Sequence, residues 1–170
     1  VAASIALLVE RVAYRPLRGA PRLVPLISAI GASFFLEYAF RGFFGPGVYA
    51  YPPIKALEGE WIIFGIGILK VQVVVAVAAF IMMAILYSIV MFTKVGKAMR
   101  AVSENKDTAA LMGIDVNRII VTTFAVGAAM AGAAGVLYAL IYRQVGFFMG
   151  FTPGIKAFTA AVLGGIGNIP

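Results

Sequence analysis

Residues 119–142 read IIVTTFAVGAAMAGAAGVLYALIY, an uninterrupted run without a charged side chain. A helix that crosses the roughly 30 Å hydrocarbon core of a bilayer needs about 20 mainly apolar residues, and this run is long enough. Residues 71–92 form a second uncharged run, and residues 23–40 form a third with one carboxylate, Glu37. The sequence therefore predicts three complete membrane-spanning helices.

The composition of the 170-residue chain supports this prediction, because 62% of its residues are hydrophobic and only 12% are charged. In soluble domains about a quarter of the residues are charged. A single hydrophobic core in a chain of this size cannot bury so much apolar surface. Cysteine and histidine are both absent, which removes thiolate metal ligands and the commonest general base. We therefore expect a membrane protein that is not an enzyme and that holds no metal or cofactor.

Two shorter apolar stretches flank the three runs. Residues 1–9 are interpreted as the end of a helix cut by a fragment boundary, and residues 157–169 as about half a helix, either part of a span or a re-entrant segment. The chain starts without methionine and inside an apolar run, so we interpret it as a piece of a longer protein. The prediction is a single all-α polytopic domain over residues 1–170, a helical bundle with partial spans at 1–9 and 157–170.

The basic residues are distributed unevenly between the connections. Nine of the 14 lysines and arginines lie in residues 10–22 and 93–118, and five lie in residues 41–70 and 143–156. Because short cytoplasmic loops are enriched in Lys and Arg, the first pair of connections is predicted to face the cytoplasm. The net charge of +7 is then explained by orientation in the bilayer, and no nucleic-acid partner is expected.

The connection of residues 93–115 has the pattern of ordered structure. Residues 98–102 can form a short helix, and Asn105 or Asp107 can cap a second one that ends near Gly113. Leu111 and Met112 are apolar residues that a solvated loop does not need. They favour docking of this helix into a partner's groove, and the alternative is a helix that lies on lipid headgroups.

Small residues recur at four-residue spacing in residues 119–142. One row is Gly127, Ala131 and Gly135, and a neighbouring row is Ala128 and Gly132. Such faces let helices approach closely, so the first row is predicted to serve helix packing or to line a translocation path. Gly164 and Gly165 are predicted to act in the same way, by close backbone approach or by breaking a helix.

Glu37 is the one carboxylate inside a predicted complete span. An intramembrane ionisable group is a functional candidate by default, as a proton relay or a substrate ligand. Phe40, where the apolar run ends, is only three positions further along the chain, so we interpret Glu37 as reaching the headgroups at the outer surface.

Several stretches together resemble one family, the LivH-type permease subunits of branched-chain amino acid ABC importers. The stretches that carry the resemblance are ERVAYRPLR at 10–18, PLISAIG at 25–31, GKAMRAV at 96–102, AALMGI at 109–114, PGIKAF at 153–158 and AVLGGIG at 161–167. The resemblance covers nearly the whole chain, and the order of the stretches makes it specific.

The resemblance implies a transport subunit in the cytoplasmic (inner) membrane of a bacterium or archaeon. Its partners would be a second permease subunit, cytoplasmic ATP-binding subunits that hydrolyse ATP, and a periplasmic substrate-binding protein. Residues 93–115 would be the element that couples to the ATPase. Its candidate residues are Gly96, Lys97, Arg100, Ala109, Ala110, Leu111, Met112 and Gly113.

The match to the importer signature has one departure. Thr108 stands where the best-known form has an acidic residue, and two residues instead of three separate Ala110 from Gly113. Three alternatives remain at this stage: a permease for an amide, urea or a sugar, part of an ion-coupled secondary transporter, and a membrane scaffold without transport. The sequence identifies no substrate-binding residue.

Overall fold

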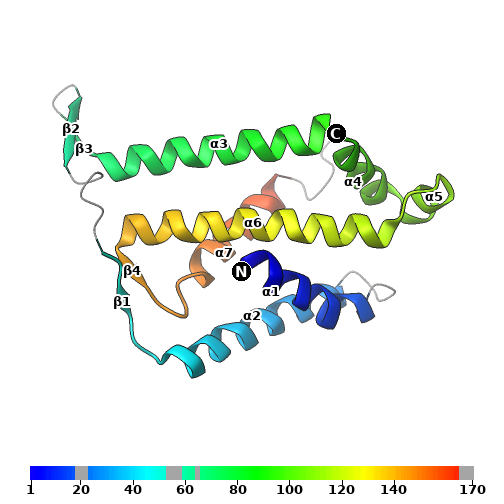
Figure 1. Cartoon of the computed structure of the whole chain (residues 1–170), viewed down its shortest axis with the longest axis horizontal. Coiled ribbons are helices and arrows are strands. Elements are labelled where there is room, and N and C mark those ends of the chain that lie inside the picture. The colour runs from blue at the N-terminus through cyan, green and yellow to red at the C-terminus, as the bar shows by residue number, and fades with distance from the viewer. Residues whose placement is uncertain (18–22, 53–58, 64–65, 165–170) are drawn as a thin grey trace.

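The computed structural model describes residues 1–17, 23–52, 59–63 and 66–164, and it is mostly helical (Figure 1). The α-helices are α1 (Ala2–Val9), α2 (Leu23–Phe44), α3 (Lys70–Phe92), α4 (Lys94–Glu104), α5 (Lys106–Leu111), α6 (Val116–Tyr142) and α7 (Phe151–Leu163). The strands are β1 (Tyr49–Ala50), β2 (Glu60–Ile63), β3 (Ile66–Leu69) and β4 (Gln144–Val145). They form two antiparallel pairs, β1 with β4 and β2 with β3.

Helices α3 and α6 confirm the helices predicted at 71–92 and 119–142. Among the described residues, these two helices are long and apolar enough to cross a membrane, with 23 and 27 residues. None of the most apolar stretch of α3 is buried within the chain, and only 6% of that of α6 is. So much uncovered apolar surface needs lipid or further helices around it.

Helix α2 extends four residues beyond the predicted run of 23–40 and ends at Phe44. The hydroxyl of Tyr49 donates a hydrogen bond to the Phe44 carbonyl at this end. Helix α2 is not one of the two candidate spans found among the described residues, which are α3 and α6. The count of three complete spans therefore stays a prediction.

The prediction that residues 10–22 form a loop is wrong for the part that the structure describes. The helix of α1 continues as a π-helical turn, Glu10–Tyr14, and a 3₁₀ turn, Arg15–Leu17. The Tyr14 ring packs 4.9 Å from the Phe124 ring of α6, centroid to centroid, and Glu10 is only 3% exposed. Contacts with α6 thus keep this charged segment helical, and a local sequence pattern does not show them.

The predicted half-helix of residues 157–169 begins earlier than expected. Helix α7 runs from Phe151 to Leu163 and therefore includes Pro153 in its first turn. Proline is tolerated there because the first backbone N–H groups of a helix have no acceptor within it. Residues 165–170 lie outside the described residues, so the nature of 157–170 as a span or a re-entrant segment stays open.

The connections rich in Lys and Arg lie at one end of the bundle and the other connections lie at the opposite end, as the charge pattern predicts. Figure 1 shows α4, α5 and the N-terminal end of α2 at one end, and β1 with β4 at the opposite end. Tyr49 pairs with Val145, and the Tyr51 N–H donates to the Arg143 carbonyl over 2.9 Å. Segments 41–70 and 143–156 therefore meet at one end, which confirms that the alternate connections share a side.

Candidate functional site

A tight corner joins α3 to α4 at the end of the bundle predicted to face the cytoplasm. Thr93 caps α4: its hydroxyl oxygen accepts from the Gly96 N–H over 3.0 Å and its hydroxyl donates to the Ile89 carbonyl over 2.5 Å. Gly96 is buried, and a Cβ atom at this position would lie 2.2 Å from the Val90 carbonyl oxygen. Only glycine fits this approach, so Gly96 sets the angle between α3 and α4.

Arg100 fastens the same corner from the side of α4. Its Nη1 lies 2.9 Å from Met91 Sδ, and its Nη2 donates to the Met91 carbonyl over 3.5 Å. A cation near the last carbonyls of α3 also interacts favourably with the negative end of that helix dipole. Arg100 therefore holds α3, whereas Lys97, one turn earlier, is exposed.

Helix α5 is short but closed at both ends. The side-chain oxygen of Asn105 accepts from the N–H groups of Asp107 and Thr108, each over 3.0 Å, so Asn105 is the cap and Asp107 is not. At the other end Gly113 adopts φ 82°, its N–H donates to Ala110, and the Ile114 N–H donates to Ala109. These bonds form a Schellman motif, as Gly113 predicts.

The side chains of α5 divide into an inner and an outer set. Ala109 is 4% exposed, so it packs within this chain and is not a free docking surface. Leu111 and Met112 are 88% and 79% exposed, and Ala110 and Gly113 are exposed as well. An exposed apolar pair on a well-capped helix is typical of a surface that a partner covers.

Helix α6 begins directly after this corner. Asp115 caps it by accepting from the Arg118 N–H over 3.1 Å, two residues after Gly113. A cavity of 480 Å³ lies between α3, α4 and α6, with Val90, Ile119 and Phe124 among its lining residues. Val102 of α4 also lines it and is 6% exposed. Helix α5 thus connects directly to α6, and α4 connects it to α3.

Of the two rows of small residues noted on α6, the row that contains Gly132 contacts α1. A Cβ atom at Gly132 would lie 2.8 Å from Ala2 Cβ, so α1 crosses α6 at this residue. No heavy atom lies within 4 Å of a Cβ at Gly127 or Gly135 in the described chain. Their predicted role in packing or in a pathway, with that of Ala131, stays a prediction. Gly164 closes α7 at its C-cap, and Gly165 lies outside the described residues.

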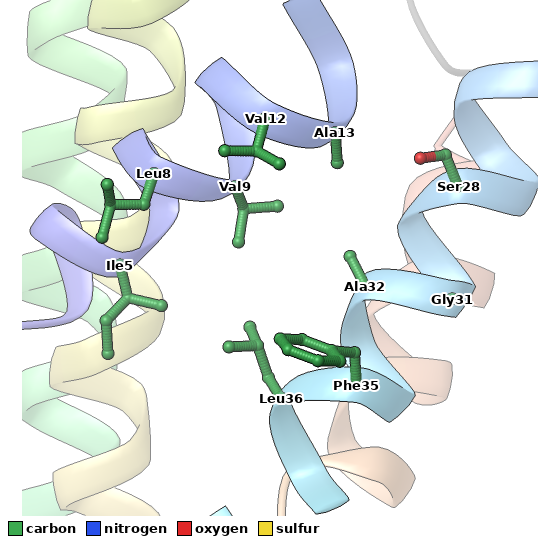
Figure 2. Close-up of a pocket in the computed structure, with 10 residues that line it drawn as sticks. All are labelled: Ile5, Leu8, Val9, Val12, Ala13, Ser28, Gly31, Ala32, Phe35 and Leu36. Carbon is green, nitrogen blue, oxygen red and sulfur yellow. The ribbon is translucent and has the colours of Figure 1, made fainter. Parts of the chain in front are cut away.

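Two cavities flank α2. The first, of 630 Å³, lies between α1 and α2, and Figure 2 shows its apolar side chains facing one another across the gap, with Ser28 contributing a hydroxyl. The second, of 570 Å³, lies between α2 and α7 and contains Ser33 and Glu37. The first is lined by apolar side chains apart from the Ser28 hydroxyl, whereas the second holds a carboxylate.

The interpretation of Glu37 as a side chain that reaches the headgroups stays a prediction. Because α2 ends at Phe44, Glu37 lies seven residues, or about 10 Å, from the end of the helix. Its Oε2 atom is buried and has no hydrogen-bond partner among the described residues. Within the described ranges, no three acidic side chains come close enough to hold a metal ion.

The chain is similar in sequence to known transport proteins. The sequence profile of the family "Branched-chain amino acid transport system / permease component" matches residues 1–170. LivH of Salmonella typhimurium, a high-affinity branched-chain amino acid transport system permease protein, is 43% identical over 167 residues, 95% of this chain and 54% of its own. BraD of Pseudomonas aeruginosa, described in the same words, is 45% identical over 165 residues, again 95% and 54%.

A more distant relative is the nucleoside ABC transporter permease protein NupB of Lactococcus lactis, 30% identical over 99 residues, 57% of this chain and 26% of NupB. No solved structure matches significantly. The chain spans about half the length of the LivH and BraD proteins that it matches. With a family profile that covers every residue, the chain belongs to the permease components of branched-chain amino acid transport systems.

Proposed function

We propose that this chain is the membrane-embedded part of a permease subunit that carries branched-chain amino acids across the inner membrane, driven by ATP-binding subunits on the cytoplasmic side. Family membership and the names of LivH and BraD support the substrate class. The observation that carries the coupling is the exposed pair Leu111 and Met112, on a helix capped at both ends.

The proposed transmission runs from α5 into the membrane helices. An ATP-binding subunit that takes Leu111 and Met112 into a groove moves α5 as a unit, because Asn105 and Gly113 fix its two ends. The movement reaches α6 through the short link to Asp115, and reaches α3 through α4. The contact of Gly96 with α3 and the bonds of Arg100 make that second link stiff.

The rest of the proposal follows from the sides of the bundle. Helices α2, α3 and α6 are the complete spans, and α1 and α7 are parts of further ones. The end with β1 and β4 faces the periplasm and receives the substrate-binding protein. The uncovered apolar surfaces of α3 and α6 face lipid, the remainder of the subunit and a second permease subunit.

The experiment tests the docking surface in the full-length parent, co-expressed with its ATP-binding subunits. We expect Leu111→Glu with Met112→Glu to abolish co-purification of the ATP-binding subunits while the permease still inserts, because a carboxylate cannot enter an apolar groove without cost. Val48→Glu is the matched control, since Val48 is 67% exposed in the segment at the opposite end. Full retention of the ATP-binding subunits by the double variant contradicts the proposed docking.

A further inference from the structure

The cleft between α2 and α7 combines one charged group with apolar walls. Glu37 and Ser33 line it from α2, one turn apart on the same face. Phe34 and Phe151 close one side, with ring centroids 5.9 Å apart, and Phe158 contributes a further aromatic wall. The volume of 570 Å³ lies within the range of about 300–1,000 Å³ that small-molecule sites occupy.

The carboxylate of Glu37 lacks the partner that its own helix offers. Arg41 lies four residues further along α2, a spacing at which opposite charges pair. Its guanidinium instead lies over the Phe147 ring, with Cζ 5.4 Å from the centroid. The buried Oε2 atom of Glu37 is left without a hydrogen-bond donor among the described residues. A buried carboxylate oxygen without a donor is costly, so this position calls for a cationic group.

Small residues on α7 leave room for that group. Gly154 of α7 and Gly150, the residue before α7, line the cleft, and no heavy atom of the described residues lies within 4 Å of a Cβ built on either. The other walls are aromatic or aliphatic, so the occupant combines a cation with an apolar body. A ligand whose only charge is negative is disfavoured beside the Glu37 carboxylate.

We propose that Glu37 binds the ammonium group of an apolar α-amino acid in the α2–α7 cleft, with Phe34, Phe158 and Ile155 around its side chain. This inference rests on the proposed transport function and adds a substrate site to it. The cleft lies near the segment of residues 143–150, at the end of the bundle assigned to the periplasm. It therefore receives the amino acid where a binding protein would release it.

The test is direct binding to the purified full-length complex without its substrate-binding protein. The probes are leucine, 3-methylbutylamine, which keeps the ammonium group, and 4-methylpentanoate, which keeps only the carboxylate. We expect the first two to compete for the site and 4-methylpentanoate to fail. Glu37→Gln should raise the Kd of leucine and of the amine by about tenfold or more, because a charge-assisted hydrogen bond is lost. Glu104→Gln, which changes an exposed carboxylate of α4, should leave both unchanged.

A second variant tests the space in the cleft. Gly154→Leu should abolish binding of the amine, whereas Gly42→Leu, at another helical glycine without neighbours, should not. Equal competition by 4-methylpentanoate, or an unchanged Kd in Glu37→Gln, overturns the proposal. If ATP-driven leucine uptake by the wild-type complex persists in that case, the site fails and the proposed function stands; absence of that uptake rejects the function itself.

A measurement on the wild-type protein removes any dependence on the folding of variants. A membrane-permeant carbodiimide should modify Glu37, and saturating 3-methylbutylamine should slow that modification at least about tenfold. An unchanged rate overturns the proposal. Complete lack of modification, with or without the amine, also overturns it, because it shows that a basic side chain from the remainder of the subunit occupies the carboxylate.

Discussion

The carbonyl oxygen of Val90 lies 2.2 Å from the place where a side chain at Gly96 would begin. Because that oxygen belongs to the backbone of α3, it cannot rotate away as a flexible side chain can. We expect Gly96→Ala to destabilise the protein by about 1–3 kcal/mol through overpacking. The thermal unfolding of the purified full-length subunit measures this loss.

Gly127→Ala is the matched control for the Gly96 variant. It adds the same methyl group inside helix α6, where no heavy atom of the described residues lies within 4 Å. Alanine is favoured over glycine in a helix interior by about 0.5–1 kcal/mol, so this variant should be neutral or more stable. Equal unfolding temperatures for both variants contradict the close contact between α3 and α4.

Loss of either cap of α5 should raise amide hydrogen exchange within that helix. Asn105→Ala removes the acceptor of two N–H groups, and Gly113→Ala forces φ 82° on a residue with a Cβ. Each change should cost about 1 kcal/mol, which is about a fivefold rise in hydrogen exchange in α5. Mass spectrometry of a peptide that covers residues 106–114 reads this rise. A uniform rise over α3 and α6 contradicts a local role.

The contact between Ala2 and Gly132 predicts that α1 is sensitive to bulk at one face of α6. Gly132→Leu should displace α1 and lower the unfolding temperature, since a Cβ there already lies 2.8 Å from Ala2 Cβ. Gly135→Leu places the same side chain on a neighbouring row with free space and should cost little in comparison. We expect a lower unfolding temperature for Gly132→Leu than for Gly135→Leu. The opposite order contradicts the crossing of α1 at Gly132.

The sides of the bundle are open to chemical labelling because the chain contains no cysteine. Single cysteines at Leu111 and Val48, in a cysteine-free parent, place one thiol at each end. We expect a membrane-impermeant maleimide added to spheroplasts to label Val48→Cys and not Leu111→Cys. In inverted membrane vesicles we expect the same reagent to label Leu111→Cys and not Val48→Cys. Labelling of both residues from the same side contradicts the predicted topology.

The sequence predicts those parts of the fold that depend on local pattern. The apolar runs at 71–92 and 119–142 predict α3 and α6, because a helix surrounded by lipid has no polar face and its apolar run is therefore continuous. Asn105 and Gly113 mark the ends of α5, since caps act within one turn. The distribution of Lys and Arg predicts which connections lie at the same end of the bundle, because basic residues cluster in every second connection.

The remaining features depend on contacts between segments that are far apart. Residues 10–17 stay helical because Tyr14 packs on Phe124, which no local pattern records. The cleft beside Glu37 is formed with α7, more than 100 residues later in the chain, so the local sequence around Glu37 does not show it. The burial of Ala109, whose motif position favoured a docking role, likewise follows from how α5 packs within the chain.

Leucine uptake into proteoliposomes that contain the full-length permease complex and its ATP-binding subunits, with the binding protein present, tests the proposed coupling most directly. We predict uptake that requires ATP on the side of α5, survives ionophores that collapse proton and sodium gradients, and is lost in the Leu111→Glu, Met112→Glu variant. Uptake that proceeds without ATP and stops when an ion gradient is collapsed would contradict it.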